Sequence, residues 1–270
     1  MTASRFEPAA DPRPTPGTLG RSRVLLHLMH RSLTLFVSLL LLSGCSAKLD
    51  LSQHPTPESL YEASMKAFRS GRWSVAQQGF QRLTFELPPR DDRSADVRYY
   101  LAECMLQQGE GLEAARQFRR VADEYPRHRL APDALLRAGD AYLKLWNNPE
   151  LDPAYGETAL ATYTELLGRF PSSPAATRAQ IRVAQLNERF AAKGFRNGDF
   201  YLRFRAYDSA IIYFKDIIAK YPRTSYAPKA VLGLVKAYDR IGYDEEKKEM
   251  CLHLEQYYPG TEDGEGRCRG

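Results

Sequence analysis

The sequence is poor in the residues from which most catalytic sites are built. It has 5 histidines in 270 residues, and after residue 44 only His54, His128 and His253 remain. None has a partner at the spacing of a metal site such as His-Glu-x-x-His. The esterase motif Gly-x-Ser-x-Gly and the phosphate loop Gly-x-x-x-x-Gly-Lys-Ser/Thr are absent as well. A pair of facing carboxylates, as in glycoside hydrolases, is a catalytic arrangement that would leave no recognisable motif in the sequence. The sequence therefore predicts a protein that is not an enzyme and uses no metal or cofactor.

Cysteine is scarce too, with four residues in the chain. Apart from Cys45, the thiols are Cys104, Cys251 and Cys268, which are too few and too far apart for a disulfide framework. Cys104 and Cys251 fall on apolar faces of predicted helices, so we expect them to be small core residues. Cys268 lies in a Gly-rich segment, 260–270, that we expect to be disordered. A bond between Cys104 and Cys251 is the alternative.

The sequence has no apolar run long enough to cross a bilayer. The run Leu33–Leu42 has about ten residues, half of the roughly 20 that a membrane helix needs. Arg21, Arg23 and Arg31 precede it, and the chain turns polar soon after it. A basic leader followed by a short apolar run is typical of a secretory signal segment.

The tetrapeptide Leu42-Ser-Gly-Cys45 that closes this run resembles the lipobox of bacterial lipoproteins. The resemblance implies that residues 1–44 are removed and that Cys45 becomes an N-terminus acylated with chains such as palmitate. Residue 46 is Ser, not the Asp that retains lipoproteins at the inner membrane, which favours the periplasmic face of the outer membrane. An ordinary secretion signal beside a chance cysteine is the alternative. Residues 1–28 are either a disordered extension or a result of the choice of start codon.

Charge gives little support to nucleic-acid binding. The whole chain has a formal net charge of +5 and a pI of 8.9, but five Arg and only two acidic residues lie in the leader. Without the leader the net charge is about +2, so the mature chain lacks a strong basic excess. We therefore expect no nucleic-acid partner.

From Pro57 to about Tyr258 the sequence has the pattern of helices. Apolar residues recur at intervals of three and four, strand-like alternation is lacking, and Gly and Pro fall between the periodic stretches. Thr56-Pro57-Glu58 is typical of a helix start, with a capping side chain, a proline in the first turn and an acid. Residues 45–56 before it are predicted to be an extended tether that carries the lipid.

The same residue types recur at fixed positions within these helices. An aromatic residue followed by proline ends a predicted helix four times, with Leu87-Pro88 as a weaker fifth case: Tyr125-Pro126, Phe170-Pro171, Tyr221-Pro222 and Tyr258-Pro259. Alanine stands twelve residues before the proline, an aromatic residue eight before it and an aliphatic residue five before it: Ala76, Phe80 and Leu83; Ala114, Phe118 and Val121; Ala159, Tyr163 and Leu166; Ala210, Phe214 and Ile217. The last unit keeps Leu254 but has Lys247 and Cys251 at the other two positions.

This pattern resembles the tetratricopeptide repeat, in which a small residue lets two helices approach, an aromatic residue fills the space between hairpins and proline ends the second helix. The segment Ala138–Leu145 also resembles the first helix of that repeat. The intervals between the prolines exceed the roughly 34-residue period, so insertions are predicted at 146–153 and 174–205. The sequence therefore predicts an all-α fold, a right-handed solenoid of five tetratricopeptide-like helix hairpins over residues 57–259.

A lipobox followed by five such repeats resembles the BamD family, the lipoproteins of the outer-membrane β-barrel assembly machinery. The more specific segments are Leu60–Ala63 in the first repeat, Phe170–Ser173 and Arg182–Arg189 around the third, and Asp208–Phe214 in the fourth. The chain departs from the family in its long leader, its degenerate fifth repeat and its Gly-rich tail. The tail puts in doubt any partner contact that a C-terminal extension makes in some relatives.

The resemblance implies a lipid-anchored, non-catalytic adaptor. Its N-terminal repeats would bind unfolded outer-membrane proteins, and its C-terminal repeats would bind the barrel subunit BamA within a complex that contains other Bam subunits. The residues carried onto the N-terminal groove are Glu58, Tyr61, Glu62, Met65, Arg69, Tyr99, Tyr100, Glu103 and Gln107, and those carried onto the docking surface are Arg196, Asp199, Arg203, Lys236 and Arg240.

Two kinds of alternative stay open at this point. The tyrosines of the groove would serve equally well to seal contacts between repeats, and the charges of the docking surface are also what a solvated helix face carries. For the function, the alternative is another tetratricopeptide lipoprotein of the envelope, such as a secretin pilotin or a Tol–Pal coordinator.

Overall fold

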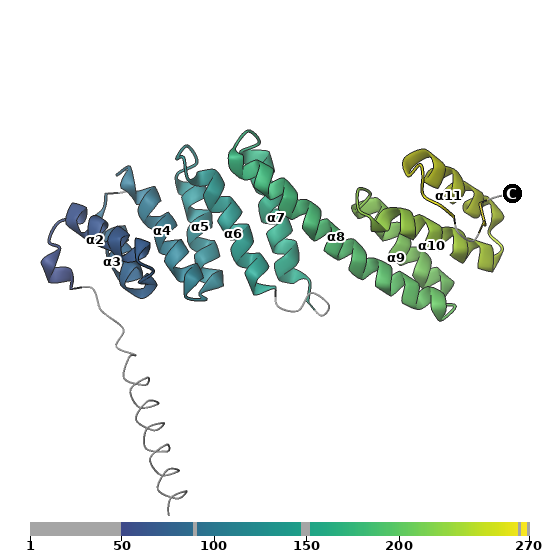
Figure 1. Ribbon diagram of the computed structural model, residues 1–270, viewed down its shortest axis with the longest axis horizontal. Helices are drawn as coiled ribbons and strands as arrows, with labels where there is room; N and C mark the ends of the chain where they lie inside the picture. The colour runs from purple at the N-terminus through teal and green to yellow at the C-terminus, as the bar shows by residue number, and fades with distance from the viewer. Residues whose placement is uncertain (1–49, 89–90, 147–151, 264–265, 269–270) are drawn as a thin grey trace, which may run out of the picture. The chain divides into compact units, whose positions relative to one another are not determined.

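The computed structural model describes residues 50–88, 91–146, 152–263 and 266–268, which in these ranges form helices and turns and no strand (Figure 1). Within these ranges a 3-10 turn, η1 (Leu51–Gln53), precedes ten α-helices. These are α2 (Pro57–Arg69), α3 (Trp73–Glu86), α4 (Arg93–Gln107), α5 (Gly111–Glu124), α6 (Ala131–Leu145), α7 (Ala154–Arg169), α8 (Pro174–Arg203), α9 (Tyr207–Lys220), α10 (Tyr226–Ile241) and α11 (Asp244–Tyr257). The leader, the lipobox with Cys45 and most of the predicted insertion 146–153 lie outside the described residues.

The helix ends follow the local chemistry of the sequence. Thr56 caps α2, its hydroxyl accepting a hydrogen bond from the Ser59 N–H at 3.2 Å, and Ser173 caps α8 in the same way. At the end of α7 the Phe170 N–H still donates to the Leu166 carbonyl at 2.8 Å, and Pro171 then has no N–H with which to continue. One detail differs from the predicted extended tether. The Asp50 side chain accepts from the Ser52 N–H at 3.1 Å, and this bond favours the short turn η1.

The helices associate in consecutive pairs, and each contacts mainly its neighbours in the chain (Figure 1). The pairs are α2 with α3, α4 with α5, α6 with α7, α8 with α9 and α10 with α11. The 30-residue helix α8 is the exception, since it contacts α6, α7, α9 and α10. It is the predicted insertion between Pro174 and Arg205, and it joins the third repeat to the fourth. The predicted all-α solenoid of five helix hairpins is confirmed.

The repeated aromatic positions form the core of each hairpin. Phe80, Phe118, Tyr163 and Phe214 are all fully buried, and so are the alanines four residues before each of them. Facing helices supply glycines where the rings approach most closely. A Cβ atom at Gly139 would lie 2.4 Å from the Tyr163 ring, and one at Gly198 or Gly233 would lie 2.6 Å from the Phe214 ring. The register read from the sequence is therefore the register of the core.

The cysteines are arranged differently from the prediction. Cys104 is a buried free thiol, as expected, but Cys251 forms a disulfide with Cys268, so the alternative bond between Cys104 and Cys251 is wrong. The expected disorder of 260–270 is also wrong for the residues that the structure describes there, because Cys268 is held by this bond. The physical reason lies in α11, the last helix of the array. In the described part of the chain no further repeat covers Cys251, so it stays half-exposed and within reach of the tail.

Candidate partner-binding faces

Ion pairs join the first helices of successive repeats, α2, α4, α6 and α8. Between α2 and α4, Arg93 contacts Glu58 at 2.8 Å and Asp91 at 2.7 Å. The hydrogen bonds from Arg93 lower the pKa of Asp91 to about 2. At the start of α4, Asp96 contacts Arg129 of the loop before α6 at 2.8 Å. The face that these helices share is therefore charged from its N-terminal end.

The pairs continue from α4 to α8 through the more buried part of this face. Arg137 of α6 holds both carboxylate oxygens of Glu103 at 2.5 and 2.7 Å and lies 3.3 Å from Asp140. Asp140 in turn contacts Arg182 of α8 at 3.4 Å and accepts the Tyr163 hydroxyl at 2.8 Å. The Glu103 side chain is only 11% exposed, so this predicted groove residue is already bound within the protein.

The aromatic groove residues lie against the core with part of each side chain at the surface. Tyr99 meets the Phe118 ring edge-on at 5.3 Å, and Tyr100 stacks on Phe80 at 5.9 Å. Tyr61 and Met65 contact the same N-terminal core. Burial raises the pKa of both Tyr61 and Tyr99. These side chains therefore contribute to the contacts between repeats, the role that the sequence left open beside binding.

Four groove residues do present exposed side chains. Glu58, Glu62 and Arg69 are exposed on α2, and Gln107 is exposed at the end of α4. The N-terminal face thus combines half-buried aromatic rings with an exposed set of charged and amide groups. Such a surface presents both hydrogen-bonding groups and ring edges.

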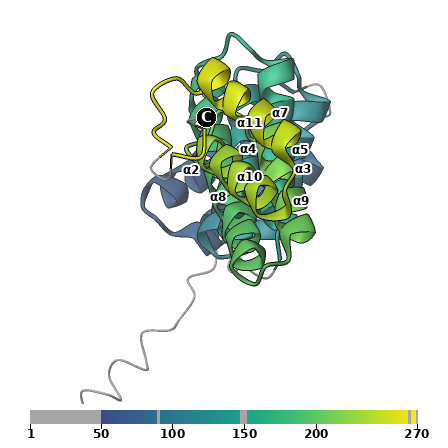
Figure 2. The same cartoon turned by 90° about the vertical axis from the view of Figure 1, so that its right-hand side faces the viewer.

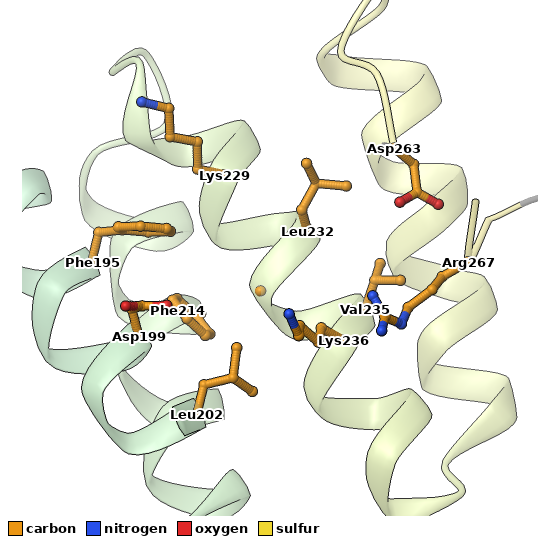
Figure 3. A pocket seen from close by; sticks show the side chains of 11 residues that line it. Phe195, Asp199, Leu202, Phe214, Lys229, Leu232, Val235, Lys236, Asp263 and Arg267 are labelled. Atoms are coloured by element: carbon orange, nitrogen blue, oxygen red, sulfur yellow. The ribbon is translucent and has the colours of Figure 1, made fainter. Parts of the chain in front are cut away.

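The C-terminal docking residues lie partly around a groove of 280 Å³, hereafter the C-terminal groove (Figure 3). Asp199 of α8 and Lys236 of α10, both predicted, line it from facing helices. The others differ in their surroundings: Arg203 pairs with Asp199 on α8 at 3.2 Å, while Arg196 and Arg240 are exposed. The structure therefore brings two of the five residues together in one concavity.

The groove also contains residues that the sequence analysis missed. Its remaining lining is apolar side chains from α8, α9 and α10, Lys229 of α10 and two residues of the C-terminal tail: Phe195, Leu202, Phe214, Leu232, Gly233, Val235, Asp263 and Arg267. The spacing of the sequence does indicate the helical lining of the groove, because Phe195, Asp199 and Leu202 follow one another at intervals of four and three residues and so share one side of α8. Nothing in the tail sequence pointed to this site.

A second surface that was missed is aromatic. Phe200 and Phe204, at the end of α8, are 46% and 70% exposed, and their ring centroids are 4.5 Å apart. Tyr201 stacks on Tyr213 of α9 beside them, at 5.5 Å. The sequence predicts only an insertion over 174–205 here, because an apolar position gives no sign of whether a neighbour covers it.

Two further features, a cluster of metal ligands and a membrane-spanning helix, are absent from the described part of the chain. Among those residues, no three His, Cys, Asp or Glu side chains gather in a way that could hold a metal ion. Within the same ranges, no helix combines the length and apolar character that crossing a bilayer requires.

Known proteins resemble this chain over most of its length. The model of the family YfiO, described as outer membrane lipoprotein, matches residues 53–254. The outer membrane protein assembly factor BamD of Vibrio cholerae is 28% identical over 242 residues, covering 84% of this chain and 99% of the relative. That of Caulobacter vibrioides is 28% identical over 225 residues, covering 81% and 72%. Among solved structures, the TPR domain of P58(IPK) covers 77% of this chain and 53% of that chain at 15% identity, with a TM-score of 0.42. Because the family model spans well over half of the sequence, this chain belongs to the YfiO family of outer membrane lipoproteins.

Proposed function

We propose that this chain is a lipid-anchored adaptor that assembles β-barrel proteins into the outer membrane without catalysing a reaction. The observation that carries the proposal is the alignment with the Vibrio cholerae assembly factor, which runs over 99% of that relative. The all-helical array supports it, because stacked helix hairpins offer long surfaces to protein partners. BamA and the other subunits of its complex are the proposed stable partners, and unfolded barrel proteins are the proposed substrates.

The lipid anchor is proposed at Cys45, and its substitution tests it. The variant Cys45→Ser would lose its acyl chains, each of which contributes about 0.8 kcal/mol per buried CH₂ to membrane binding. We expect it to leave the outer-membrane fraction, whereas the matched variant Ser46→Ala stays there. A Cys45→Ser protein that fractionates like wild type would show that protein contacts, not lipid, hold the chain at the membrane.

The N-terminal face is proposed to receive the unfolded barrel proteins. Its half-buried tyrosines and exposed polar groups suit an extended peptide that ends in an aromatic residue. Because Tyr99 supports the core, the test uses exposed Arg69 instead. In fluorescence anisotropy with such a peptide, Arg69→Glu should weaken binding, whereas the control Arg82→Glu, on the second helix α3, should not. Equal affinities for the two variants would remove this face from substrate binding.

The C-terminal groove is proposed to dock BamA. Lys236→Glu would place a second negative charge in the groove that Asp199 also lines, so we expect less BamA to be recovered when the variant is purified from detergent-solubilised membranes. Arg116→Glu is the matched control, since it makes the same change of charge on α5, at a side chain that is 61% exposed. Recovery of a secretin without BamA by the wild-type protein would favour the pilotin reading and overturn the proposal.

A further inference from the structure

The described residues after α11 lie beside the last helices (Figure 2), and a disulfide bonds them to α11. Of these, residues 260–263 and 266–268 are hereafter the C-terminal clasp. Cys268 forms the disulfide with Cys251 of α11, seventeen residues earlier. The Cys268 N–H also donates to the Asp263 carboxylate at 2.7 Å, which joins the two described parts of the clasp.

The clasp reaches α10 through Arg267. Its Nε lies 3.1 Å from the carboxylate of Asp239, which also contacts Lys247 of α11 at 2.8 Å. Hydrogen bonds from Lys247 and Arg267 lower the pKa of Asp239. The Arg267 side chain is only 19% exposed, so its guanidinium is held in place at the surface of the last hairpin.

In this position the clasp forms one wall of the C-terminal groove (Figure 3). In Figure 3 Asp263 and Arg267 lie on one side of the groove, Phe195 and Asp199 lie on the other, and Lys236 lies between them. If the clasp left α11, the groove would lose this wall and both of the charged groups that the wall carries. The shape of the groove thus depends on a segment outside the helices.

The fifth repeat departs from the repeat pattern at two positions, and both serve the clasp. Lys247 stands where the other repeats have a buried alanine, and it shares Asp239 with Arg267. Cys251 stands where they have a buried aromatic residue, and it bonds to Cys268. Among the described residues no helix packs on the far side of α11, so Lys247 and Cys251 are available to the clasp rather than buried beneath a further hairpin. The sequence of α11 suits the clasp rather than a sixth hairpin.

We propose that the Cys251–Cys268 disulfide is a redox-sensitive clasp that completes the C-terminal groove for its partner, the periplasmic part of BamA. In the oxidised protein Arg267 and Asp263 are in place and the groove binds. In the reduced protein the tail leaves and the groove is open on one side. This inference rests on the proposed function for the identity of the partner, but not for the behaviour of the clasp itself.

The disulfide is placed where a reductant can reach it. Cys251 and Cys268 border a cleft of 560 Å³ that Leu252 and Tyr258 also line. A small dithiol would act by exchange. One of its thiolates attacks a sulfur of the disulfide and forms a mixed disulfide, and its second thiolate then releases the other cysteine. Two electrons and two protons thus pass to Cys251 and Cys268, which become thiols, while the dithiol becomes a disulfide.

Hydrogen exchange measured by mass spectrometry tests the clasp in the full chain purified in detergent. Excess dithiothreitol should speed exchange in 229–240 and 259–268 by about tenfold or more, the effect of losing one charge-assisted contact. Exchange in α4 and α5 should not change. The double variant Cys251→Ser/Cys268→Ser should behave like the reduced protein without reductant, and Cys104→Ala should keep the full response. Unchanged exchange on reduction would overturn the clasp.

Binding of the purified periplasmic domains of BamA tests the link to the partner. Reduction and the double serine variant should each weaken the affinity about tenfold. Arg267→Ala keeps the disulfide. This variant should bind BamA more weakly, but hydrogen exchange in its tail should stay slower than in the reduced protein. If exchange responds to reduction but the affinity does not, the clasp only stabilises α11 and the inference is wrong. If the oxidised wild-type protein does not bind BamA at all, the proposed function fails, and the exchange data still report on the clasp.

Discussion

The ring of Phe214 is closely enclosed by two glycines, and it supports a prediction whose sign can be worked out in advance. One edge of this fully buried ring faces Gly233 of α10, and the other edge faces Gly198 of α8. A Cβ added at Gly233 would lie 2.6 Å from two ring atoms, and one at Gly198 would lie 2.6 Å from a third. An edgewise movement of the ring away from one glycine would therefore bring it closer to the other.

The variant Gly233→Ala sets two effects against each other. Alanine is favoured over glycine within a helix by about 0.8–1 kcal/mol. Overpacking of a core that cannot relax costs about 1–3 kcal/mol. We expect the second effect to prevail, with a net loss of up to about 2 kcal/mol in the free energy of unfolding. For a domain of this size that corresponds to a fall of up to roughly 8 °C in Tm.

The matched control is Gly168→Ala in α7, where a Cβ would meet no atom within 4 Å. There only the helix propensity changes, so this variant should unfold at a slightly higher urea concentration than wild type. Both variants are compared by urea unfolding followed by circular dichroism. If Gly233→Ala is as stable as Gly168→Ala, the ring is not confined and the register assigned to the fourth repeat is wrong.

A double variant makes the test independent of the absolute values. Phe214→Ala alone should cost about 3–5 kcal/mol, as other buried aromatic residues do. In that background the Cβ of Gly233→Ala enters the space that the ring has left, so the same substitution should become neutral or stabilising. Such a reversal of sign is an interaction energy of direct contact. Additive effects would mean that Gly233 and Phe214 do not touch.

Three further predictions use the same unfolding and labelling assays. Arg137→Met leaves Glu103 buried without its partner and should lower the free energy of unfolding by roughly 3 kcal/mol. Arg203→Met, on the exposed end of α8, should lower it by no more than about 1 kcal/mol, and equal losses would show that the Arg137–Glu103 pair is solvated. Burial raises the pKa of Cys104 to about 12, so this thiol should resist maleimide in the native protein at pH 8, and rapid labelling would contradict its burial. The raised pKa also contributes to the free energy of unfolding below about pH 9; this contribution should fade as the pH rises toward 12 and be missing in Cys104→Ala. Tyr163→Phe removes a hydroxyl that donates at 2.8 Å to a carboxylate and should cost about 1 kcal/mol, with an unchanged urea midpoint as the contrary result.

The sequence was sufficient for the helices, the pairs and the core because these depend on local and periodic signals. A proline ends a helix wherever it stands, and a fixed distance from that proline decides which side chains face the neighbouring hairpin. The burial of Phe214 and Tyr163 therefore follows from the sequence alone. The long helix α8 followed as well, because an interval between prolines that is too long must be filled by additional chain.

The ion pairs of the first helices could not be assigned, although their spacing carries a trace of the repeat. Glu58 pairs with Arg93 at a separation of 35 residues, and Glu103 pairs with Arg137 at 34, close to one repeat length. The surface of each helix, however, has several charges of both signs, and each can reach more than one partner. The choice is made by the angle between neighbouring hairpins, which no periodic pattern contains. Glu103 was for this reason predicted as a groove residue rather than as a buried partner of Arg137.

The C-terminal tail shows a different limit of local reading. Glycine-rich sequence favours disorder because the unfolded chain has so many conformations. This expectation applies to a tail that has no contact with the rest of the protein. A disulfide removes much of that freedom, but its formation here depends on Cys251 being left uncovered at the end of the array. The sequence indicated this uncovered position through a departure from the repeat pattern. Lys247 and Cys251 break the repeat at the two positions where a sixth hairpin would demand an alanine and an aromatic residue. A departure at such positions therefore indicates that something other than another repeat covers the last helix.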